Sequence, residues 1–220
     1  MHAVGIVAAA GSGLRLGADR PKALVELHGR PLVAWAVQTL LDGGVDRVVV
    51  AVPTGERSLF AAALPGVDLV DGGATRTASV RAALAAAGED ADAVLVHDAA
   101  RPLTPPAVVA RVLTALTGDA RAVVPVLPVV DTTVVVTEAG EVAATLERST
   151  LRRVQTPQGF DRATLVAAYA VLPDDVELTD DAAVVRAGGV PVVTVAGDER
   201  ATKVTGPHDL ALAELFASAG

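Results

Sequence analysis

AVGIVAAAGSGLRLGADRPK, residues 3–22, joins a short apolar run to a glycine-rich turn that carries cations. The apolar run predicts a buried β-strand. Glycines at positions 11, 13 and 17 let the backbone turn sharply, so that its N–H groups can converge on one small volume that suits phosphate oxygens. Arg15 and Lys22 place positive charge beside that volume. The stretch therefore predicts an α/β protein whose first strand leads into an anion-binding loop.

Two well-known phosphate-binding loops do not fit this stretch. A dinucleotide fingerprint needs G-x-G-x-x-G at the start of a helix, but the glycine spacing here is one residue too long. Pro21 would also fall inside that helix, where it costs about 3 kcal/mol. A P-loop needs Lys after its last glycine, and Ala18 follows Gly17. We expect an extended, cationic loop from position 11 to about 30; a plain strand-to-helix connection is the alternative, but it leaves the cations unexplained.

Lysine is rare in this chain. Of the 18 Lys and Arg residues, only Lys22 and Lys203 are lysines. A lysine ammonium is a compact point charge, whereas the guanidinium of arginine is a planar fork. We interpret the two lysines as positions with a geometric need for a point charge, with chance retention on the surface as the alternative.

Bulk composition limits the class of protein. The chain has 220 residues, of which 51% are hydrophobic and 2% aromatic, and this predicts one domain over 1–220 with a core of Ala, Val and Leu. A net charge of −8 argues against binding nucleic acid through bulk electrostatics. There is no cysteine, and we see neither a leader pattern nor a long apolar run. We expect a cytoplasmic protein with no membrane partner and no protein metal site.

Strand-like and helix-like segments alternate up to position 126. The pattern predicts a mostly parallel sheet with helices on both faces, a Rossmann-like three-layer α/β/α domain. Loops 11–22, 72–79 and 98–101 each follow a predicted strand, and ligands of such sheets bind at the carboxyl ends of the strands. We expect strands at 3–7, 45–52, 67–70, 93–97 and 122–126, and helices at 31–41, 57–64, 76–87 and 106–116.

The alternation breaks at Asp131. Residues 132–136 and 142–146 flank Glu138-Ala139-Gly140, which predicts a β-hairpin, and we interpret 130–150 as a protruding arm. Packing of the hairpin on its own domain is the alternative to pairing with a second subunit. We expect a turn-rich return segment at 153–160, helices at 161–171, 180–187 and 208–218, a strand at 190–196, and Lys203 in a loop.

With these loops placed, the sequence resembles the 2-C-methyl-D-erythritol 4-phosphate cytidylyltransferase family over essentially its whole length. The chain departs from the family pattern at Ala8 and Leu16, where relatives commonly have Pro and Met, and at Ala74, where some relatives carry an acid. The segments that carry the resemblance are AAGSGLRLGADRPKAL, DGGATRTASV, LVHDAARPL, DTT, LERSTLRRVQTPQGF, LTDDAAVV and TKVTGPHDLALAE.

The resemblance implies a reaction of CTP with methylerythritol phosphate, giving a cytidine diphospho-alcohol and pyrophosphate in non-mevalonate isoprenoid synthesis. It implies Mg²⁺ carried with the CTP phosphates, and a homodimer formed through the arm. A phosphate monoester has a second pKa of about 6, so the attacking group is already an oxyanion and needs no general base. The residues that match the family's catalytic cations are Arg15, Lys22 and Lys203.

The resemblance also assigns binding residues. Ser79 could instead cap or pack its helix, Asp98 could cap the following segment, and Arg101 could be a surface charge. His97 invites a metal interpretation, but a lone His-Asp pair is more often structural. The implied nucleotide-binding residues are Ala9, Ala10, Gly11, Gly13, Gly73, Arg76, Ser79 and Ala99; the implied residues for the polyol phosphate are Asp98, Arg101, Thr132, Arg148 and Thr179.

Two rival functions fit the same motifs. A cytidylyltransferase acting on ribitol 5-phosphate shares most of these motifs, although Arg148 and the stretch 179–181 favour methylerythritol phosphate. A non-catalytic nucleotide-binding protein of the same fold is the second rival, and the presence of both lysines and all three strand-end loops argues against it.

Overall fold

A computed structural model of the chain describes residues 1–11, 20–173, 176, 178 and 180–218. Its centre is a mixed, mostly parallel sheet in the order β10-β7-β11-β6-β1-β4-β5, with β12 also paired to β7. The strands are β1 (Ala3–Ala8), β4 (Arg47–Val52), β5 (Asp68–Asp71), β6 (Ala93–Asp98), β7 (Ala122–Pro128), β10 (Arg152–Val154), β11 (Gln158–Asp161) and β12 (Val193–Ala196).

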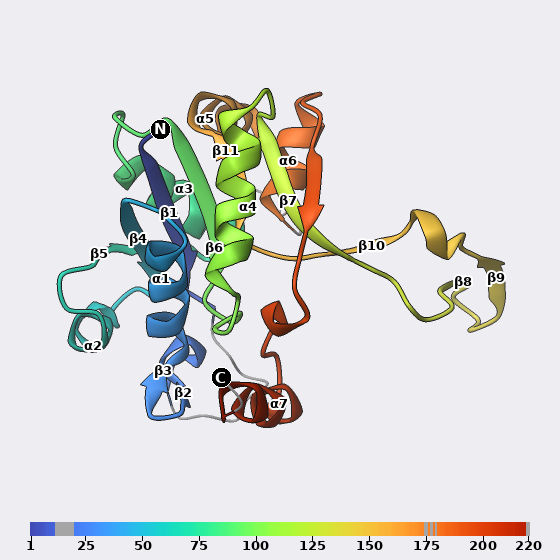
Figure 1. The fold of residues 1–220 in the computed structure, drawn as a ribbon, viewed down its shortest axis with the longest axis horizontal. Helices are drawn as coiled ribbons and strands as arrows, with labels where there is room; N and C mark the ends of the chain where they lie inside the picture. Colours follow the sequence, from blue (N-terminus) through green and yellow to red (C-terminus); the bar gives the residue numbers. More distant parts are fainter. Residues whose placement is uncertain (12–19, 174–175, 177, 179, 219–220) are drawn as a thin grey trace.

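Helices cover both faces of the sheet (Figure 1). The central strands are apolar on both sides: Ile6 of β1 pairs with Val49 of β4 and Val96 of β6, and all three are fully buried. Such strands need cover on each face. One face packs against α1 (Leu32–Asp42), α2 (Arg57–Ala63) and α4 (Pro106–Thr117), and the other against α3 (Arg76–Ala86), α5 (Arg162–Val171) and α6 (Asp181–Ala187). The predicted three-layer α/β fold is confirmed.

The prediction of a turn-rich return segment at 153–160 is wrong. Residues 152–154 and 158–161 are the strands β10 and β11, and β11 lies antiparallel between β6 and β7. Pro157 and Gly159 are turn-like residues locally, but pairing on both sides and burial outweigh that preference. Gly159 has a packing reason to be glycine: a Cβ there would lie 2.3 Å from a methyl group of Val112 in α4.

We expect Gly159→Ala to lower the free energy of unfolding by about 1–3 kcal/mol, because the added methyl forces α4 away from β11. Gly206→Ala is the matched control: no heavy atom lies within 4 Å of the new Cβ, so its effect should stay within about 0.5 kcal/mol. Urea unfolding of the two variants and the parent measures both values. Equal stability of the two variants would contradict the close approach of α4.

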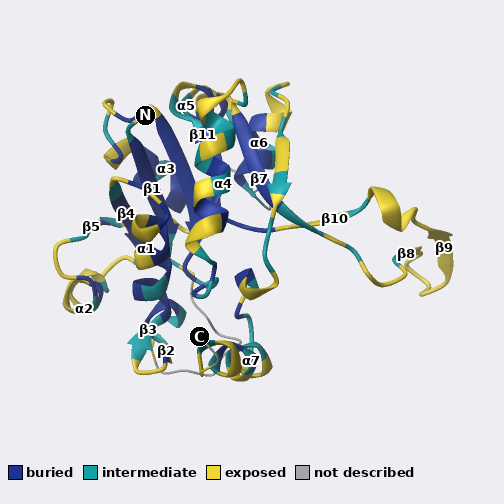
Figure 2. Cartoon of the chain, viewed as in Figure 1, coloured by how far each residue is buried: buried dark blue, intermediate teal, exposed yellow. Residues whose placement is uncertain are grey.

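The predicted hairpin is confirmed and projects from the body of the molecule (Figure 1). Its strands are β8 (Val134–Val136) and β9 (Val142–Thr145), paired antiparallel around a turn in which Gly140 has φ +82°. Figure 2 shows that nearly the whole arm is exposed, and every residue of both strands is exposed in this chain.

The remaining elements lie near the carboxyl ends of the parallel strands (Figure 1). A small hairpin, β2 (Glu26–Leu27) with β3 (Arg30–Pro31), packs against the closing helix α7 (Pro207–Ser218). Among the helices that the structure describes, none combines the length and apolar character needed to cross a bilayer.

Candidate active site

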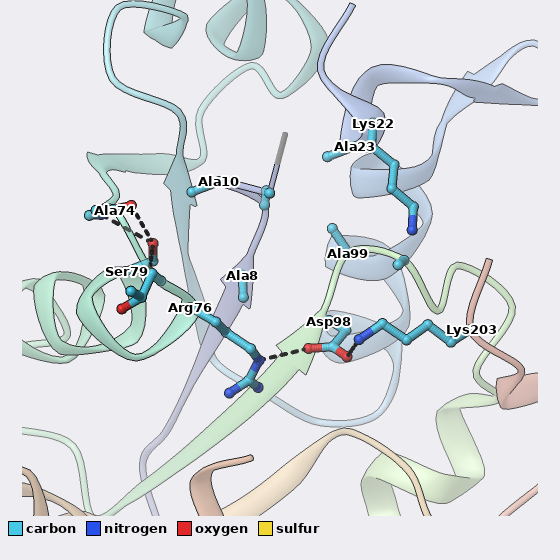
Figure 3. Close-up of a pocket in the computed structure, with 15 residues that line it drawn as sticks. Ala8, Ala10, Lys22, Ala23, Ala74, Arg76, Ser79, Asp98, Ala99 and Lys203 are labelled. Atoms are coloured by element: carbon cyan, nitrogen blue, oxygen red, sulfur yellow. Dashed lines mark hydrogen bonds and ion pairs between the residues drawn. The ribbon is translucent and has the colours of Figure 1, made fainter. Parts of the chain in front are cut away.

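A cavity of about 360 Å³ opens at the carboxyl ends of β1, β5 and β6 (Figure 3). The register explains why these ends meet: the last residue of β1, Ala8, pairs with Ala51 of β4 and with Asp98, the last residue of β6. The cavity is lined by Ala8, Ala9, Ala10, Gly11, Lys22, Ala23, Gly73, Ala74, Thr75, Arg76, Ser79, Asp98, Ala99, Ala100 and Lys203.

The cavity gathers most of the residues singled out in the sequence. Gly13, Arg15 and Thr179 lie outside the described residues. Arg101, Thr132 and Arg148 are described but do not line the cavity in this chain. The predicted residues that do line it are Ala9, Ala10, Gly11, Lys22, Gly73, Arg76, Ser79, Asp98, Ala99 and Lys203.

The two glycine turns touch each other at one wall of the cavity. A Cβ on Gly72 would lie 2.6 Å from the Cβ of Ala10, so glycine allows the loops to meet. Thr75 caps α3 by accepting a hydrogen bond from the backbone of Ala78 at 3.1 Å. The Ser79 hydroxyl accepts from the Gly73 N–H at 3.1 Å and donates to the Thr75 carbonyl at 2.8 Å. The Ser79 hydroxyl therefore holds the turn together at a position that also lines the cavity.

Asp98 is the electrostatic centre of the cavity. Its carboxylate accepts from Arg76 Nε at 3.2 Å and from Lys203 Nζ at 2.8 Å, and Arg101 Nε lies 3.9 Å away. Burial by itself would raise the pKa of Asp98, but the charges of Arg76 and Lys203 outweigh burial and hold that pKa far below its usual range. Asp98 is thus a permanent anion that positions cations.

Both lysines of the chain line this cavity. Lys22 opens a 3₁₀ turn, Lys22–Leu24, in which Ala23 and Leu24 are buried and anchor the turn to the body. Lys203 follows a second 3₁₀ turn, Glu199–Ala201. Arg101 fixes this turn, because Arg101 Nη1 donates a hydrogen bond to the Ala201 carbonyl at 2.7 Å. Figure 3 shows both lysine side chains reaching toward the loop after β6. Two segments far apart in the sequence therefore place point charges in one cavity.

The arm keeps its two predicted residues away from this cavity. Thr132 and Arg148 are exposed, and Arg148 Nη1 donates to the Val130 carbonyl at 2.7 Å at the base of the arm. Arg101, in contrast, is no surface charge, because its side chain is only 13% exposed.

His97 has a structural role. It is fully buried in β6, and its Nδ1 is hydrogen-bonded to the Thr156 hydroxyl at 2.8 Å, while that hydroxyl accepts from the Asp98 N–H at 3.1 Å. Burial lowers the pKa of His97 to about 4. Within the described part of the chain, His, Cys, Asp and Glu residues form no group of three that could hold a metal ion.

The neutral state of His97 predicts acid sensitivity. Its unfolded pKa is about 6.5, so between pH 6.5 and 4 the unfolded chain binds a proton that the folded chain excludes. The free energy of unfolding should therefore fall as the pH drops through this window, by up to about 3 kcal/mol. His97→Gln keeps a polar group that can hydrogen-bond Thr156 and cannot titrate, so the stability of this variant should depend less on pH. Parallel slopes for parent and variant in urea unfolding at several pH values would contradict this role.

Comparison with known proteins decides the family. A family model described as 2-C-methyl-D-erythritol 4-phosphate cytidylyltransferase matches residues 3–218. The chain belongs to this family. The cytidylyltransferase of this name from Nocardia farcinica is 54% identical over 215 residues, which cover 96% of this chain and 92% of that protein. The one from Rhodococcus jostii is 51% identical and covers 99% and 96%, respectively.

Solved structures of 2-C-methyl-D-erythritol 4-phosphate cytidylyltransferases share the architecture. The crystal structure of that enzyme from Thermus thermophilus superposes with a TM-score of 0.83 at 40% identity, covering 99% of this chain and 100% of that one. The enzyme of the same name from Francisella tularensis has a TM-score of 0.83 at 26% identity, covering 98% and 99%. The chain is thus a nucleotidyltransferase of this family, as its motifs predicted.

Sequence reasoning missed the partners that hold Arg76. Arg76 Nη2 donates to Asp181 of α6 at 2.7 Å, and the Tyr169 hydroxyl of α5 donates to the same carboxylate at 2.6 Å. The motif LTDDAAVV contains Asp181, but nothing in the spacing of residues 76, 169 and 181 shows that they meet.

Proposed function

We propose that this chain transfers the cytidylyl group of CTP to 2-C-methyl-D-erythritol 4-phosphate and releases pyrophosphate. The observation that carries the proposal is the meeting of Lys22, Lys203 and the backbone turn at Ala9–Gly11 in one cavity, in a chain of this family. A phosphate oxygen of the polyol attacks the α-phosphorus of CTP. The new P–O bond forms as the bond from the α-phosphorus to the bridging oxygen breaks, and the electron pair leaves with pyrophosphate.

The chemistry requires charge stabilisation and alignment rather than proton transfer, because the attacking phosphate is already ionised at neutral pH. Lys22 and Lys203 would neutralise charge that develops on the phosphoryl oxygens, together with Arg15. Asp98 would keep Lys203 in place rather than act as a base, since its pKa is held far below neutrality.

Mg²⁺ would enter with the triphosphate. Both carboxylate oxygens of Asp98 already accept hydrogen bonds from cations, so this side chain fits a metal only if Lys203 or Arg76 moves. The ion, when bound, would neutralise triphosphate charge and orient the pyrophosphate leaving group. The backbone N–H groups of the turn and the two lysines would hold the same phosphates.

The polyol phosphate would be held beside Asp98 and Arg101, with Thr179 and the arm residues Thr132 and Arg148. Because the arm residues lie away from the cavity of their own chain, we propose that a second copy of the chain supplies them in a homodimer. The exposed valines of the hairpin, such as Val135 and Val142, support a partner on this arm.

Pyrophosphate release tests the function. CTP and Mg²⁺ are mixed with the enzyme and either 2-C-methyl-D-erythritol 4-phosphate or ribitol 5-phosphate, and phosphate is measured after pyrophosphatase treatment. We expect turnover with the methylerythritol substrate. Preferred turnover of ribitol 5-phosphate would overturn the substrate assignment, and CTP binding without pyrophosphate release would overturn catalysis.

Mixing two inactive variants tests the shared site. Lys22→Ala damages the cavity of its own chain, whereas Arg148→Ala damages the arm that would complete the other site. In a mixed dimer one site has an intact cavity and an intact arm, so random exchange of subunits should recover about a quarter of the parent activity. Lack of recovery after proven subunit exchange would place Arg148 in the site of its own chain.

A further inference from the structure

A network of hydrogen bonds and ion pairs runs from helix α5 into the cavity. It begins at the Tyr169 hydroxyl and passes through Asp181, Arg76 and Asp98 to the ammonium of Lys203. The successive donor–acceptor distances are 2.6, 2.7, 3.2 and 2.8 Å. Five groups from five separate segments are therefore connected, and only the last two have a stated part in the proposed function.

Asp181 is well satisfied although it is fully buried. One carboxylate oxygen accepts from Arg76 Nη2 and the other from Tyr169, and the Asp181 side chain has 0% exposure. Burial, followed by the charge of Asp181, raises the pKa of Tyr169. The phenol therefore stays protonated and donates a hydrogen bond to Asp181. A buried carboxylate without these partners would cost several kcal/mol.

The orientation of Arg76 decides what Asp98 can bind. With Nη2 held by Asp181, Arg76 presents Nε to one oxygen of Asp98, and the other oxygen is left for Lys203 (Figure 3). A guanidinium that is not held elsewhere prefers to pair with a carboxylate through two parallel hydrogen bonds. Such a pair would bring a second cation to the oxygen that Lys203 now uses, and the two would compete for it.

We propose that Asp181 is a positioning residue that draws the distal end of Arg76 away from Asp98 and thereby keeps Lys203 at the cavity. The inference rests on the proposed function for its catalytic consequence, but the placement of Lys203 can be measured without substrate. Asp181 does not itself line the cavity, and it reaches Lys203 only through Arg76, which does. It acts on Lys203 through two intervening side chains.

The lysine content of the chain offers a direct readout. Lys22 and Lys203 are the two lysines in the sequence, and both line the cavity from different loops. Acetylation with a limiting amount of an amine-reactive reagent, followed by peptide mass spectrometry, gives the labelling rate of each lysine. The ratio of the Lys203 rate to the Lys22 rate reports release of Lys203 from Asp98, because general loosening of the cavity would raise both rates.

Asp181→Asn keeps the shape of the side chain and removes its charge. We expect the Lys203/Lys22 ratio to rise about tenfold, the change produced by losing one charge-assisted hydrogen bond. Asp180→Asn is the matched control, since Asp180 caps the same helix through Ala183 and contacts Gln158 but does not contact Arg76. Its ratio should equal the parent ratio. No rise in Asp181→Asn, or an equal rise in Asp180→Asn, would overturn the proposal.

A double variant tests the competition itself. Arg76→Gln combined with Asp181→Asn removes the buried pair together, so the Arg76 guanidinium no longer competes for Asp98, and the labelling ratio should return to the parent value or below it. A ratio that stays as high as in Asp181→Asn would overturn the proposal. If Asp181→Asn does not fold, Tyr169→Phe is the test. In this variant Asp181 keeps its charge but loses the hydrogen bond from Tyr169, so its carboxylate pairs more strongly with Arg76 and draws Arg76 further from Asp98. The Lys203/Lys22 ratio should then fall. A ratio at or above the parent value would then overturn the proposal.

The catalytic consequence is measured separately. Asp181→Asn should lower kcat by about tenfold or more and change KM for CTP less than kcat, because Lys203 is displaced while the backbone turn that would hold the nucleotide is untouched. A changed labelling ratio in a protein that releases no pyrophosphate with any substrate would refute the proposed function and leave the positioning network intact. An unchanged ratio in an active enzyme would refute the network alone.

Discussion

Replacing Lys22 with alanine should lower kcat by about 10²–10³-fold and leave the unfolding transition where it is in the parent. The reason is that the ammonium extends into the cavity, whereas the anchoring of its turn depends on Ala23 and Leu24, which the substitution does not touch. A preorganised cation acts where charge develops in the transition state, so its loss affects kcat more than the binding of CTP. Steady-state kinetics and urea unfolding of the same preparation measure both effects.

Arg20→Ala is the matched control for Lys22→Ala. Arg20 lies two residues away, its side chain is 59% exposed, and its carboxylate partner is Glu26 at 3.7 Å, outside the cavity. Loss of this loop charge should leave kcat near the parent value. A Lys22→Ala enzyme with near-normal kcat would refute the catalytic role, and a raised KM with unchanged kcat would restrict Lys22 to ground-state binding.

Replacing Asp98 with alanine should lower the free energy of unfolding by about 3 kcal/mol, near the lower end of the range for breaking a buried ion pair. The full penalty is reduced because Arg76 keeps Asp181 as a counterion and the Lys203 side chain is 44% exposed. Activity should be lost as well, since Lys203 loses its anchor. Urea unfolding and pyrophosphate release measure the two effects.

Asp68→Ala is the matched control for Asp98→Ala. Asp68 pairs with Arg47 at 3.2 Å, but both side chains are more than 40% exposed, so its loss should cost about 0–1 kcal/mol. The two variants should also differ in acid. Because its pKa is depressed in the folded protein, Asp98 stabilises the fold above its unfolded pKa of about 3.8, and this stabilisation is lost as the pH falls through and below that value. The free energy of unfolding of Asp98→Ala should therefore fall less steeply with decreasing pH in this range than that of the parent. Equal effects of the two variants would contradict the central position of Asp98.

Much of the fold was predictable from local patterns. The apolar run in β1, the helical spacing of α1 and the glycine turn of the arm each depend on neighbours within a few residues, and each prediction agrees with the structure. The position of the cavity followed from topology, because parallel strands bring the loops after β1, β5 and β6 to one edge. Comparison with family members then assigned the chain to the family that the motifs indicated.

Strand β11 was not predictable in this way, because its local residues favour a turn and its stability comes from two neighbouring strands and from α4. The same holds for the contact of Arg76 with Asp181, which joins residues 105 positions apart. Local sequence therefore determined the helices, most strands and which cationic residues line the cavity. Which carboxylate each cation meets depended on the folded chain, because charges pair across distances that become short only after the core has packed.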